Sequence, residues 1–320
     1  MSFARWLGKW RSRAFLDRAA SDSTILLAGM GRSGTTWAAD LINYDHSYRV
    51  MFEPFNPQRV KKALPFLNIQ YMNPHAQDAD KSASARAILS GRLRHAAVDL
   101  DNRGLVFRRR LIKEVRCNLM LGWLKSLQPE MSVVLLVRHP LSVARSLIRL
   151  GWEDPGPDGD FQVMLRQPEL LRDFPVIERA LRGIDGEDRL QRLVFQWCVF
   201  HLVPLAHFSE GGLTVLFYEE LLVDPQQALG PLFASLDRSF ERDRLAQSLP
   251  IPSRTNYLNP GHDPRATDRL KGWQREFTAA QIQRTYEILA LFGMDQVYPA
   301  ERPTGFPPPD MGPPDRAVAR

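Results

Sequence analysis

Residues 26–37, LLAGMGRSGTTW, constrain the fold more than any other part of this chain. They continue an apolar run from Ser23 to Ala28 through three glycines, Gly29, Gly31 and Gly34, into a segment that can begin a helix. Glycine tolerates positive φ angles and lets the backbone approach a ligand closely. A strand, a glycine-rich turn and a helix N-terminus direct successive backbone N–H groups at one anion. The sequence therefore predicts a phosphate-binding loop in an α/β fold.

The loop differs from the nucleotide-binding pattern G-x-x-x-x-G-K-[ST] at one informative position. The frame from Gly29 to Thr36 matches both glycines and the final hydroxyl, but Thr35 stands where lysine is expected. The nearest cation is Arg32. Because the lysine that reaches the β- and γ-phosphates is missing, a metal-dependent ATP site is disfavoured.

A second apolar run, residues 132–137 (SVVLLV), is typical of a strand buried on both faces of a parallel sheet. Nucleotide hydrolases commonly place an acidic residue near the end of such a strand to hold Mg²⁺. Here Arg138, His139 and Pro140 follow instead. The sequence therefore predicts a second anion site and no metal.

Three motifs in order resemble those of one enzyme family. Residues 31–37 (GRSGTTW) resemble the 5′-phosphosulfate loop of the sulfotransferases, and residues 136–146 (LVRHPLSVARS) resemble their 3′-phosphate motif. Residues 217–221 (FYEEL), followed by Asp224 and Pro225, look like a third signature. The resemblance covers roughly residues 23–295. It implies an α/β fold like that of the P-loop NTPases, with a central parallel sheet flanked by helices and with helical and loop insertions forming an acceptor cap.

The resemblance also implies the activity and the donor site. The expected reaction is transfer of a sulfuryl group from 3′-phosphoadenosine-5′-phosphosulfate (PAPS) to a hydroxyl, leaving 3′,5′-adenosine bisphosphate. The residues implied for the donor are Ser33, Gly34, Thr35 and Thr36 at the 5′-phosphate, Arg138 and Ser146 at the 3′-phosphate, and Trp37 or Tyr218 at the adenine. Of a C-terminal loop found in cytosolic members, only residues 269–273 remain. Arg269 and Lys271 are thus further candidates for the 3′-phosphate, whereas Trp273 suits either the site or packing.

Two residues are candidates for the chemical step. Many relatives that sulfate phenols and steroids have lysine where Arg32 stands, so arginine here looks more like the carbohydrate-directed branch, which implies a sugar or glycolipid acceptor. Arg32 suits stabilisation of the charge on the leaving phosphate. Residues 51–55 (MFEPF) resemble the Phe-Glu-Pro element of carbohydrate sulfotransferases, so Glu53 is the expected general base.

Other assignments stay open at this point. Glu53 also fits a plain loop carboxylate before a proline, and the phenol and steroid branch uses histidine, for which His46, His75 and His95 are available. Lys113 and Glu114 close a probable strand over residues 110–114. Lys113, like Arg116, suits either the ligand crevice or the surface.

One domain, residues 21–298, accounts for most of the chain of 320 residues, of which 44% are apolar. Alternating patterns predict helices over residues 83–97, 118–126, 141–150, 190–208 and 279–291, and a strand over 213–218. Residues 56–109 and 151–186 have weaker periodicity and are expected to form the acceptor-facing cap. Residues 299–320 are proline-rich and are expected to form a flexible tail.

Residues 1–20 interleave aromatic with basic side chains, which is typical of a basic amphipathic helix that lies on an anionic membrane or packs against the domain. No run of about 18 apolar residues occurs, so a cytoplasmic enzyme, with or without contact at the inner membrane surface, is expected. Cys117 and Cys198 read as buried thiols in helices, and Trp123 and Trp197 as core residues. The net charge of +6 suits a doubly phosphorylated donor and comes with no zinc spacing or nucleic-acid-binding module.

Two alternatives to a sulfotransferase remain from the sequence. One is an unusual P-loop kinase, which Thr35 and Arg138 disfavour. The other is a noncatalytic module that binds nucleotides or sulfated glycans without transferring a group.

Overall fold

The computed structural model describes residues 15–100, 102, 104–152, 159–208, 211–238, 266–298 and 303. Residues 1–14 of the predicted amphipathic segment therefore lie outside the described residues. The predicted tail does so too, apart from Pro303.

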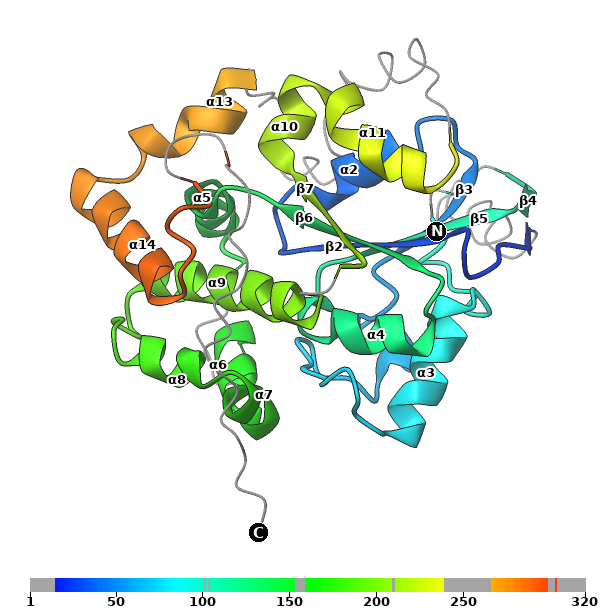
Figure 1. The fold of residues 1–320 in the computed structure, drawn as a ribbon, viewed down its shortest axis with the longest axis horizontal. Helices are drawn as coiled ribbons and strands as arrows, with labels where there is room; N and C mark the ends of the chain where they lie inside the picture. Colours follow the sequence, from blue (N-terminus) through cyan, green and yellow to red (C-terminus); the bar gives the residue numbers. More distant parts are fainter. Residues whose placement is uncertain are drawn as a thin grey trace, which may run out of the picture.

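A parallel sheet of five strands in the order β3-β5-β2-β6-β7 forms the centre of the fold (Figure 1). Its strands are β2 (Thr24–Gly29), β3 (Tyr48–Phe52), β5 (Arg109–Glu114), β6 (Ser132–Val137) and β7 (Leu213–Phe217). A small sheet pairs β1 (Leu16–Asp17) with β4 (Val106–Phe107). The three strand predictions, over residues 23–28, 110–114 and 132–137, are confirmed to within one residue at each end, as is the strand predicted over 213–218. The α/β fold class is likewise confirmed.

Both faces of the sheet are buried, and the central strands β2 and β6 are apolar over almost their whole length. Leu26 and Ala28 of β2 pack into one hydrophobic cluster, and Ile25 and Leu27 pack into the other. Alternate residues of a strand point to opposite faces, so each face acquires its own core. In Figure 1 the helices α3, α4 and α9 lie on one side of the sheet and α2, α10 and α11 on the other.

The helices have the following bounds: α2 (Thr35–Ile42), η1 (Lys61–Ala63), α3 (Ala79–Leu89), η2 (Asn118–Met120), α4 (Leu121–Leu127), α5 (Pro140–Leu150), α6 (Asp160–Leu165), α7 (Pro168–Asp173), α8 (Pro175–Leu181), α9 (Arg189–His207), α10 (Tyr218–Val223), α11 (Pro225–Ser235), α13 (Ala266–Lys271), η4 (Gly272–Arg275) and α14 (Ala279–Leu291). The helices predicted over residues 141–150, 190–208 and 279–291 are confirmed, and the one predicted over 118–126 is divided between η2 and α4.

The helix predicted over residues 83–97 is wrong at both ends. It begins at Ala79, where the Asp78 side chain caps the backbone N–H of Lys81, and it ends at Leu89. Gly91 follows with φ of 70°, which a helix does not contain. The residues beyond it turn back to bind the amino end of the sheet.

Two smaller predictions also need correction. Cys117 is fully buried as expected but lies in the turn before η2 and not in a helix, whereas Cys198 is buried in α9. In the predicted amphipathic segment, Phe15 is buried and residues 16–17 form β1, so this part of it packs against the domain as a strand and not as a helix.

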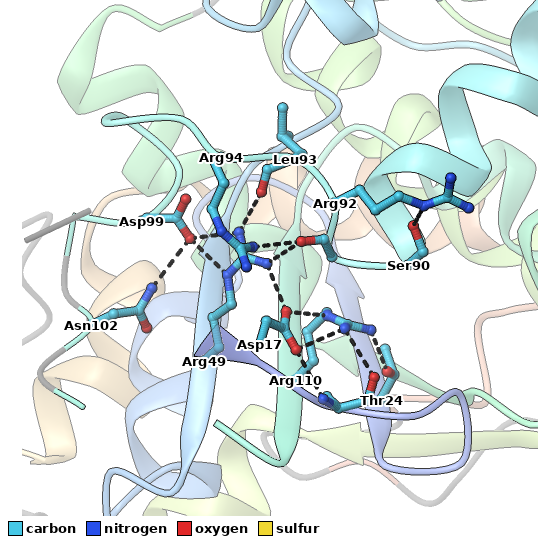
Figure 2. A network of polar contacts seen from close by, with 12 residues as sticks. Asp17, Thr24, Arg49, Ser90, Arg92, Leu93, Arg94, Asp99, Asn102 and Arg110 are labelled. Carbon is cyan, nitrogen blue, oxygen red and sulfur yellow. Dashed lines mark hydrogen bonds and ion pairs between the residues drawn. The ribbon is translucent and has the colours of Figure 1, made fainter. Parts of the chain in front are cut away.

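The amino ends of three strands are joined by a buried ionic network (Figure 2). Asp17 accepts from Arg49 at 2.7 Å and from Arg110 at 2.9 Å, and Arg49 also pairs with Asp99 at 2.8 Å. Backbone carbonyls of Gly91 and Leu93 accept from Arg49. The two buried guanidinium groups therefore fasten β3, β5 and the segment after α3 at the edge of the sheet opposite the carboxyl ends.

The two segments predicted to form the acceptor cap contact each other. The Tyr71 hydroxyl donates to Asp173 at 2.7 Å, and the Tyr71 N–H donates to the Gln167 side chain at 2.7 Å. Asn68 donates to Asp160 at 2.5 Å. Residues 159–186, which the structure describes, contain three short helices, and two of them begin at a proline, a residue suited to the first turn. No helix among the described residues combines the length and apolar character needed to cross a membrane.

Candidate active site

The candidate residues come together because the strands are parallel. The glycine-rich loop follows β2, Arg138 follows β6, Tyr218 follows β7 and Glu53 follows β3. All four positions therefore lie at the carboxyl edge of the sheet, where open α/β folds bind ligands. Neighbouring strands lie about 4.8 Å apart, so β3 and β2, separated by β5, place Glu53 and the loop roughly 10 Å apart.

The loop between β2 and α2 has the backbone that the sequence predicts. Gly34 is the N-cap residue of α2 and has φ of 93°, a left-handed conformation that favours glycine. A Cβ at Gly34 would lie 2.6 Å from the ring of Tyr218. At Gly29 a Cβ would lie 2.7 Å from the carbonyl oxygen of Leu136. Close contacts thus require glycine at both positions, and at Gly34 the backbone conformation requires it as well. The N-terminus of α2 opens onto the loop.

Contacts with helix α5 and with Trp152, just after the end of that helix, hold Arg32 in place. Its Nε donates to the Ser146 hydroxyl at 3.0 Å, and its guanidinium lies 5.1 Å from the ring centre of Trp152. Burial and the nearby charge of Arg138 lower the pKa of Arg32. Two cations are therefore held close enough to repel each other, an arrangement that an anion between or beside them would relieve.

Arg138 connects three parts of the site. Its two terminal nitrogens donate to the backbone carbonyl oxygens of Arg32 and of Arg269, each at 3.1 Å. Its guanidinium lies 4.2 Å from the ring centre of Tyr218. Within the described residues, neither Arg32 nor Arg138 forms an ion pair with a carboxylate. Paired cations without an acidic partner are typical of a phosphate site.

The residues expected to bind PAPS fit a phosphate group. The Ser33 hydroxyl is buried and, among the described residues, has no hydrogen-bond partner. The Nε of Arg138 is also buried and has no hydrogen-bond partner among the described residues. Because buried polar atoms are normally hydrogen-bonded, these two atoms indicate a ligand with acceptor oxygens at this point. Thr35 and Thr36 begin α2 beside them.

The two aromatic residues considered for adenine lie in contact with each other. Trp37 and Tyr218 pack edge to face with their ring centres 5.4 Å apart. Trp37 is only 5% exposed and belongs to the core cluster on the α2 side of the sheet. Tyr218 covers Gly34 and Arg138 and is therefore the one in closer contact with the phosphate-binding residues.

The C-terminal candidates divide between the site and its surroundings. Arg269 reaches the site through its backbone carbonyl, which accepts from Arg138. Lys271 is exposed at the end of α13. Trp273 is buried and stacks on His139 with ring centres 4.4 Å apart. Trp273 thus packs against the residue that follows the end of β6. Trp123 and Trp197 are confirmed as core residues.

Glu53 lies in a compact ionic cluster. Its two carboxylate oxygens accept from Lys113 and from Arg116, each at 2.7 Å. Burial raises the pKa of Glu53, but the charges and hydrogen bonds of Lys113 and Arg116 outweigh it, so its pKa is lowered. The carboxylate is therefore ionised at neutral pH. Glu53 has φ of 48°, a strained conformation of a kind that clusters at functional sites.

A second carboxylate, Glu114, holds the backbone around this cluster. It is fully buried and accepts from the backbone N–H groups of Phe55, Val115 and Arg116 at 2.8, 3.0 and 3.1 Å. Burial and the neighbouring charge of Glu53 raise the pKa of Glu114. Glu114 joins the end of β5 to the segment after β3, and this fixes the strained turn at Glu53. Sequence reasoning placed Glu114 at a strand end but gave it no role.

Another buried carboxylate supports Arg138 from behind. Glu219 accepts from the backbone N–H of His139 at 3.0 Å and from the hydroxyl of Tyr298 at 3.1 Å. The indole of Trp197 donates to the Arg138 carbonyl oxygen at 2.9 Å. Burial, with the charge of Arg138, lowers the pKa of His139 to about 3, so its ring is neutral. The only sequence signal for this support was the position of Glu219 within the third motif.

The alternative histidines lie elsewhere. His46 is on an exposed turn before β3, and the backbone N–H of His95 binds Asp99 in the network at the amino edge. His75 is exposed in the loop before α3. Among the residues that the structure describes, no group of three or more histidine, cysteine, aspartate or glutamate side chains is arranged to hold a metal ion.

No curated protein matches this chain in sequence. Solved structures that it resembles include the sulfotransferase domain from the curacin biosynthetic pathway, with 19% identity over 83% of this chain and 96% of that chain and a TM-score of 0.45. The sulfotransferase domain of the Synechococcus PCC 7002 olefin synthase has 14% identity over 84% and 94% of the two chains, with a TM-score of 0.45. Mouse sulfotransferase SULT7A1 complexed with PAP has 18% identity over 88% and 87%, with a TM-score of 0.41. With TM-scores below 0.5, these likenesses support no argument about the site.

The sequence itself carries the assignment. A family model described as the sulfotransferase family matches residues 24–242, more than half of the chain. The matched region runs from the first residue of β2 past the end of α11. It includes the glycine-rich loop, Glu53, Arg138 and Tyr218. The chain is therefore an enzyme of the sulfotransferase family.

Proposed function

We propose that this protein transfers a sulfuryl group from PAPS to a hydroxyl of a carbohydrate or glycolipid acceptor in the cytoplasm. The observation that carries the proposal is the cation pair Arg32 and Arg138, which forms no direct ion pair with a carboxylate within the described residues and lies beside the N-terminus of α2. Such a pair suits a ligand with separated anionic groups. The buried Ser33 hydroxyl and the Nε of Arg138 add unmatched donors that PAPS oxygens would satisfy.

The roles of the residues follow from their positions. Ser33, Gly34, Thr35 and Thr36 surround the N-terminus of α2 and would hold the 5′-phosphate, with the helix dipole favouring its charge. Arg138 and Ser146 would hold the 3′-phosphate, and Tyr218 with Trp37 would border the adenine. Arg269 and Lys271 would complete the site from α13. PAPS supplies the sulfuryl group and a phosphate leaving group.

The chemical step needs a base and a stabilised leaving group. Glu53 would accept the proton of the acceptor hydroxyl as the new S–O bond forms. Arg32 would stabilise the negative charge on the phosphate oxygen from which sulfur departs. Lys113 and Arg116 both contact Glu53, so one of these ion pairs must lengthen when the carboxylate takes up the proton. Their charges also suit the sulfuryl oxygens.

A binding comparison tests the donor before any acceptor is known. Calorimetric titration without magnesium should show strong preference for 3′,5′-adenosine bisphosphate over AMP, because only the bisphosphate engages both cations. Titration with ATP and magnesium should show weaker binding, since Thr35 replaces the lysine of the nucleotide loop. Preference for magnesium ATP would support a kinase instead. Bisphosphate binding without transfer of labelled sulfate to any hydroxyl acceptor would support a noncatalytic module.

A further inference from the structure

Trp152 differs from every other tryptophan that the structure describes. It is 51% exposed, whereas Trp37, Trp123, Trp197 and Trp273 are each 5% exposed or less. The four buried rings are accounted for by core packing. A large aromatic ring that is held partly in water beside a candidate active site can offer its apolar surface to a ligand.

The backbone at Trp152 is fixed by the end of helix α5. Gly151 adopts a left-handed conformation with φ of 61°, and its N–H donates to the carbonyl oxygen of Ile148 at 3.2 Å. The N–H of Trp152 donates to the carbonyl oxygen of Leu147 at 3.3 Å. This pattern of bonds is a glycine-terminated helix cap, which sets the direction in which the chain leaves the helix. The position of the ring is therefore built into the fold.

The ring also contacts Arg32, the residue expected to stabilise the charge on the leaving phosphate. The guanidinium of Arg32 lies 5.1 Å from the indole centre, and the Nε of Arg32 is bonded to Ser146, one helical turn and a half before Trp152. Helix α5 thus presents a hydroxyl to Arg32, and the chain that leaves the helix presents an aromatic ring to it. The cation covers part of the ring, but Trp152 as a residue remains 51% exposed.

The opposite border of the site has a different character. Beyond the glycine-rich loop lies the cluster of Glu53, Lys113 and Arg116, whose hydrogen bonds continue to Asn68. An acceptor between the two borders would meet hydrogen-bonding groups on one side and an aromatic surface on the other. A pyranose ring has this same division, because its hydroxyls point outward around an apolar C–H face.

We propose that Trp152 is a stacking platform for the acceptor and that it selects cyclic, polyhydroxylated acceptors over acyclic ones. The platform would hold the apolar face of the sugar ring while one hydroxyl reaches the sulfuryl group beside Arg32. The proposal rests on the function proposed above and deepens it by assigning a residue to acceptor choice. Trp152 would contribute nothing to the donor beyond its contact with Arg32.

The test uses the full chain with Trp152→Ala and Trp152→Phe. Probes are PAPS with a set of methyl pyranosides and, for comparison, the acyclic polyols glycerol and xylitol. For pyranosides, Trp152→Ala should lower kcat/KM about tenfold or more, mainly through KM, and Trp152→Phe should retain most of the activity because it keeps an aromatic face. The affinity for 3′,5′-adenosine bisphosphate should stay within about twofold in both variants. The variant Leu105→Ala removes an apolar side chain that is 72% exposed beside β4 and should leave all parameters unchanged.

Three outcomes would overturn the proposal. The first is an unchanged kcat/KM for pyranosides in Trp152→Ala. The second is a parallel loss of bisphosphate affinity, which would show that Trp152 acts only by holding Arg32. The third is a wild-type protein that sulfates glycerol and xylitol as well as it sulfates pyranosides, and in that case the proposed sulfotransfer would still stand. Failure of the wild-type protein to bind the bisphosphate would instead contradict the proposed function itself.

Discussion

Arg138 donates a hydrogen bond to the backbone carbonyl oxygen of Arg32, and this bond joins the ends of β6 and β2. The two strands are neighbours in the sheet, so residues more than a hundred positions apart in sequence meet at its carboxyl edge. The bond uses one terminal nitrogen of Arg138 to hold the glycine-rich loop. Arg138 therefore shapes the loop as well as carrying charge.

Replacement of Arg138 should weaken binding of the 3′-phosphorylated nucleotide. Hydrogen bonds to charged groups contribute about 1.5–3 kcal/mol, so Arg138→Ala should raise the Kd for 3′,5′-adenosine bisphosphate roughly ten- to hundredfold. Calorimetry without magnesium measures this change. The control is Arg172→Ala, because the side chain of Arg172 is 69% exposed in α7 and away from the loop. Equal affinities in the two variants would make Arg138 a residue of the fold alone.

Replacement of Glu53 should separate turnover from donor binding. Glu53→Gln keeps the size of the side chain but removes the base, so turnover should fall by at least about a hundredfold. The affinity for the bisphosphate should change little, because Glu53 follows β3, whereas the residues expected to bind PAPS follow β2, β6 and β7. Glu178→Gln, an exposed position on α8, is the matched control. Undiminished turnover in Glu53→Gln would remove Glu53 as the base.

The pH dependence of turnover should respond to Lys113. The pKa of Glu53 is lowered because Lys113 and Arg116 outweigh the effect of burial. The base is then ionised above a pH that lies below the ordinary value of 4.5, and turnover should decline only in more acidic solution. Of the two cations, Lys113 lowers the pKa of Glu53 more. Lys113→Met removes this effect, so the pKa of Glu53 should rise and the acidic limb of the pH profile should move to higher pH. A pH profile that keeps the same acidic limb would show that another group controls it.

Replacement of Gly34 should damage the phosphate-binding loop. An alanine there would meet both the positive φ and the Tyr218 ring at 2.6 Å, so Gly34→Ala should lower stability by about 1–3 kcal/mol and bisphosphate affinity by more than tenfold. Thermal unfolding and calorimetry report the two effects. Gly31→Ala provides the comparison for folding, since a Cβ at Gly31 meets no atom within 4 Å. Equal melting temperatures for the two variants would contradict the steric argument.

The network at the amino edge of the sheet should contribute to stability and not to catalysis. Asp17→Ala leaves Arg110 buried without a carboxylate partner, which should cost roughly 3–5 kcal/mol. Burial raises the pKa of Asp17, but Arg110 and Arg49 outweigh it and lower the pKa below 3.8. The contribution of Asp17 is therefore present above about pH 4 and is lost as the pH falls through the folded-state value.

Chemical denaturation at pH 7 and at pH 3 measures that contribution. The difference between wild type and Asp17→Ala should be smaller at the lower pH. Asp22→Ala, at an exposed position in the same segment, should have little effect. A loss of kcat in the folded Asp17→Ala protein, with stability unchanged, would contradict a purely structural role.

The sequence by itself determined strands β2, β5, β6 and β7 and the motifs that follow them, but it predicted neither β3 nor the order of the strands. The continuous apolar runs of β2 and β6 predict buried parallel strands, because a strand that is covered on both faces has apolar side chains on both. Gly34 and Arg138 were predictable because a motif at the end of a strand depends on local conformation. The helix over residues 83–97 was misplaced because its start depends on a cap at Asp78 and its end on tertiary contacts of the chain after Gly91.

Only the tertiary structure decided which side chains became partners. Glu53, Lys113 and Arg116 come from two neighbouring strand ends, and Asp17, Arg49 and Arg110 come from three strands. Pairs of this kind have no fixed sequence spacing, so a single chain gives no periodic signal for them. The exposure of Trp152 was equally invisible, because an aromatic residue after a helix reads the same whether it is buried or open to water. Local sequence therefore fixes the elements, whereas charge pairing and exposure depend on how distant elements meet.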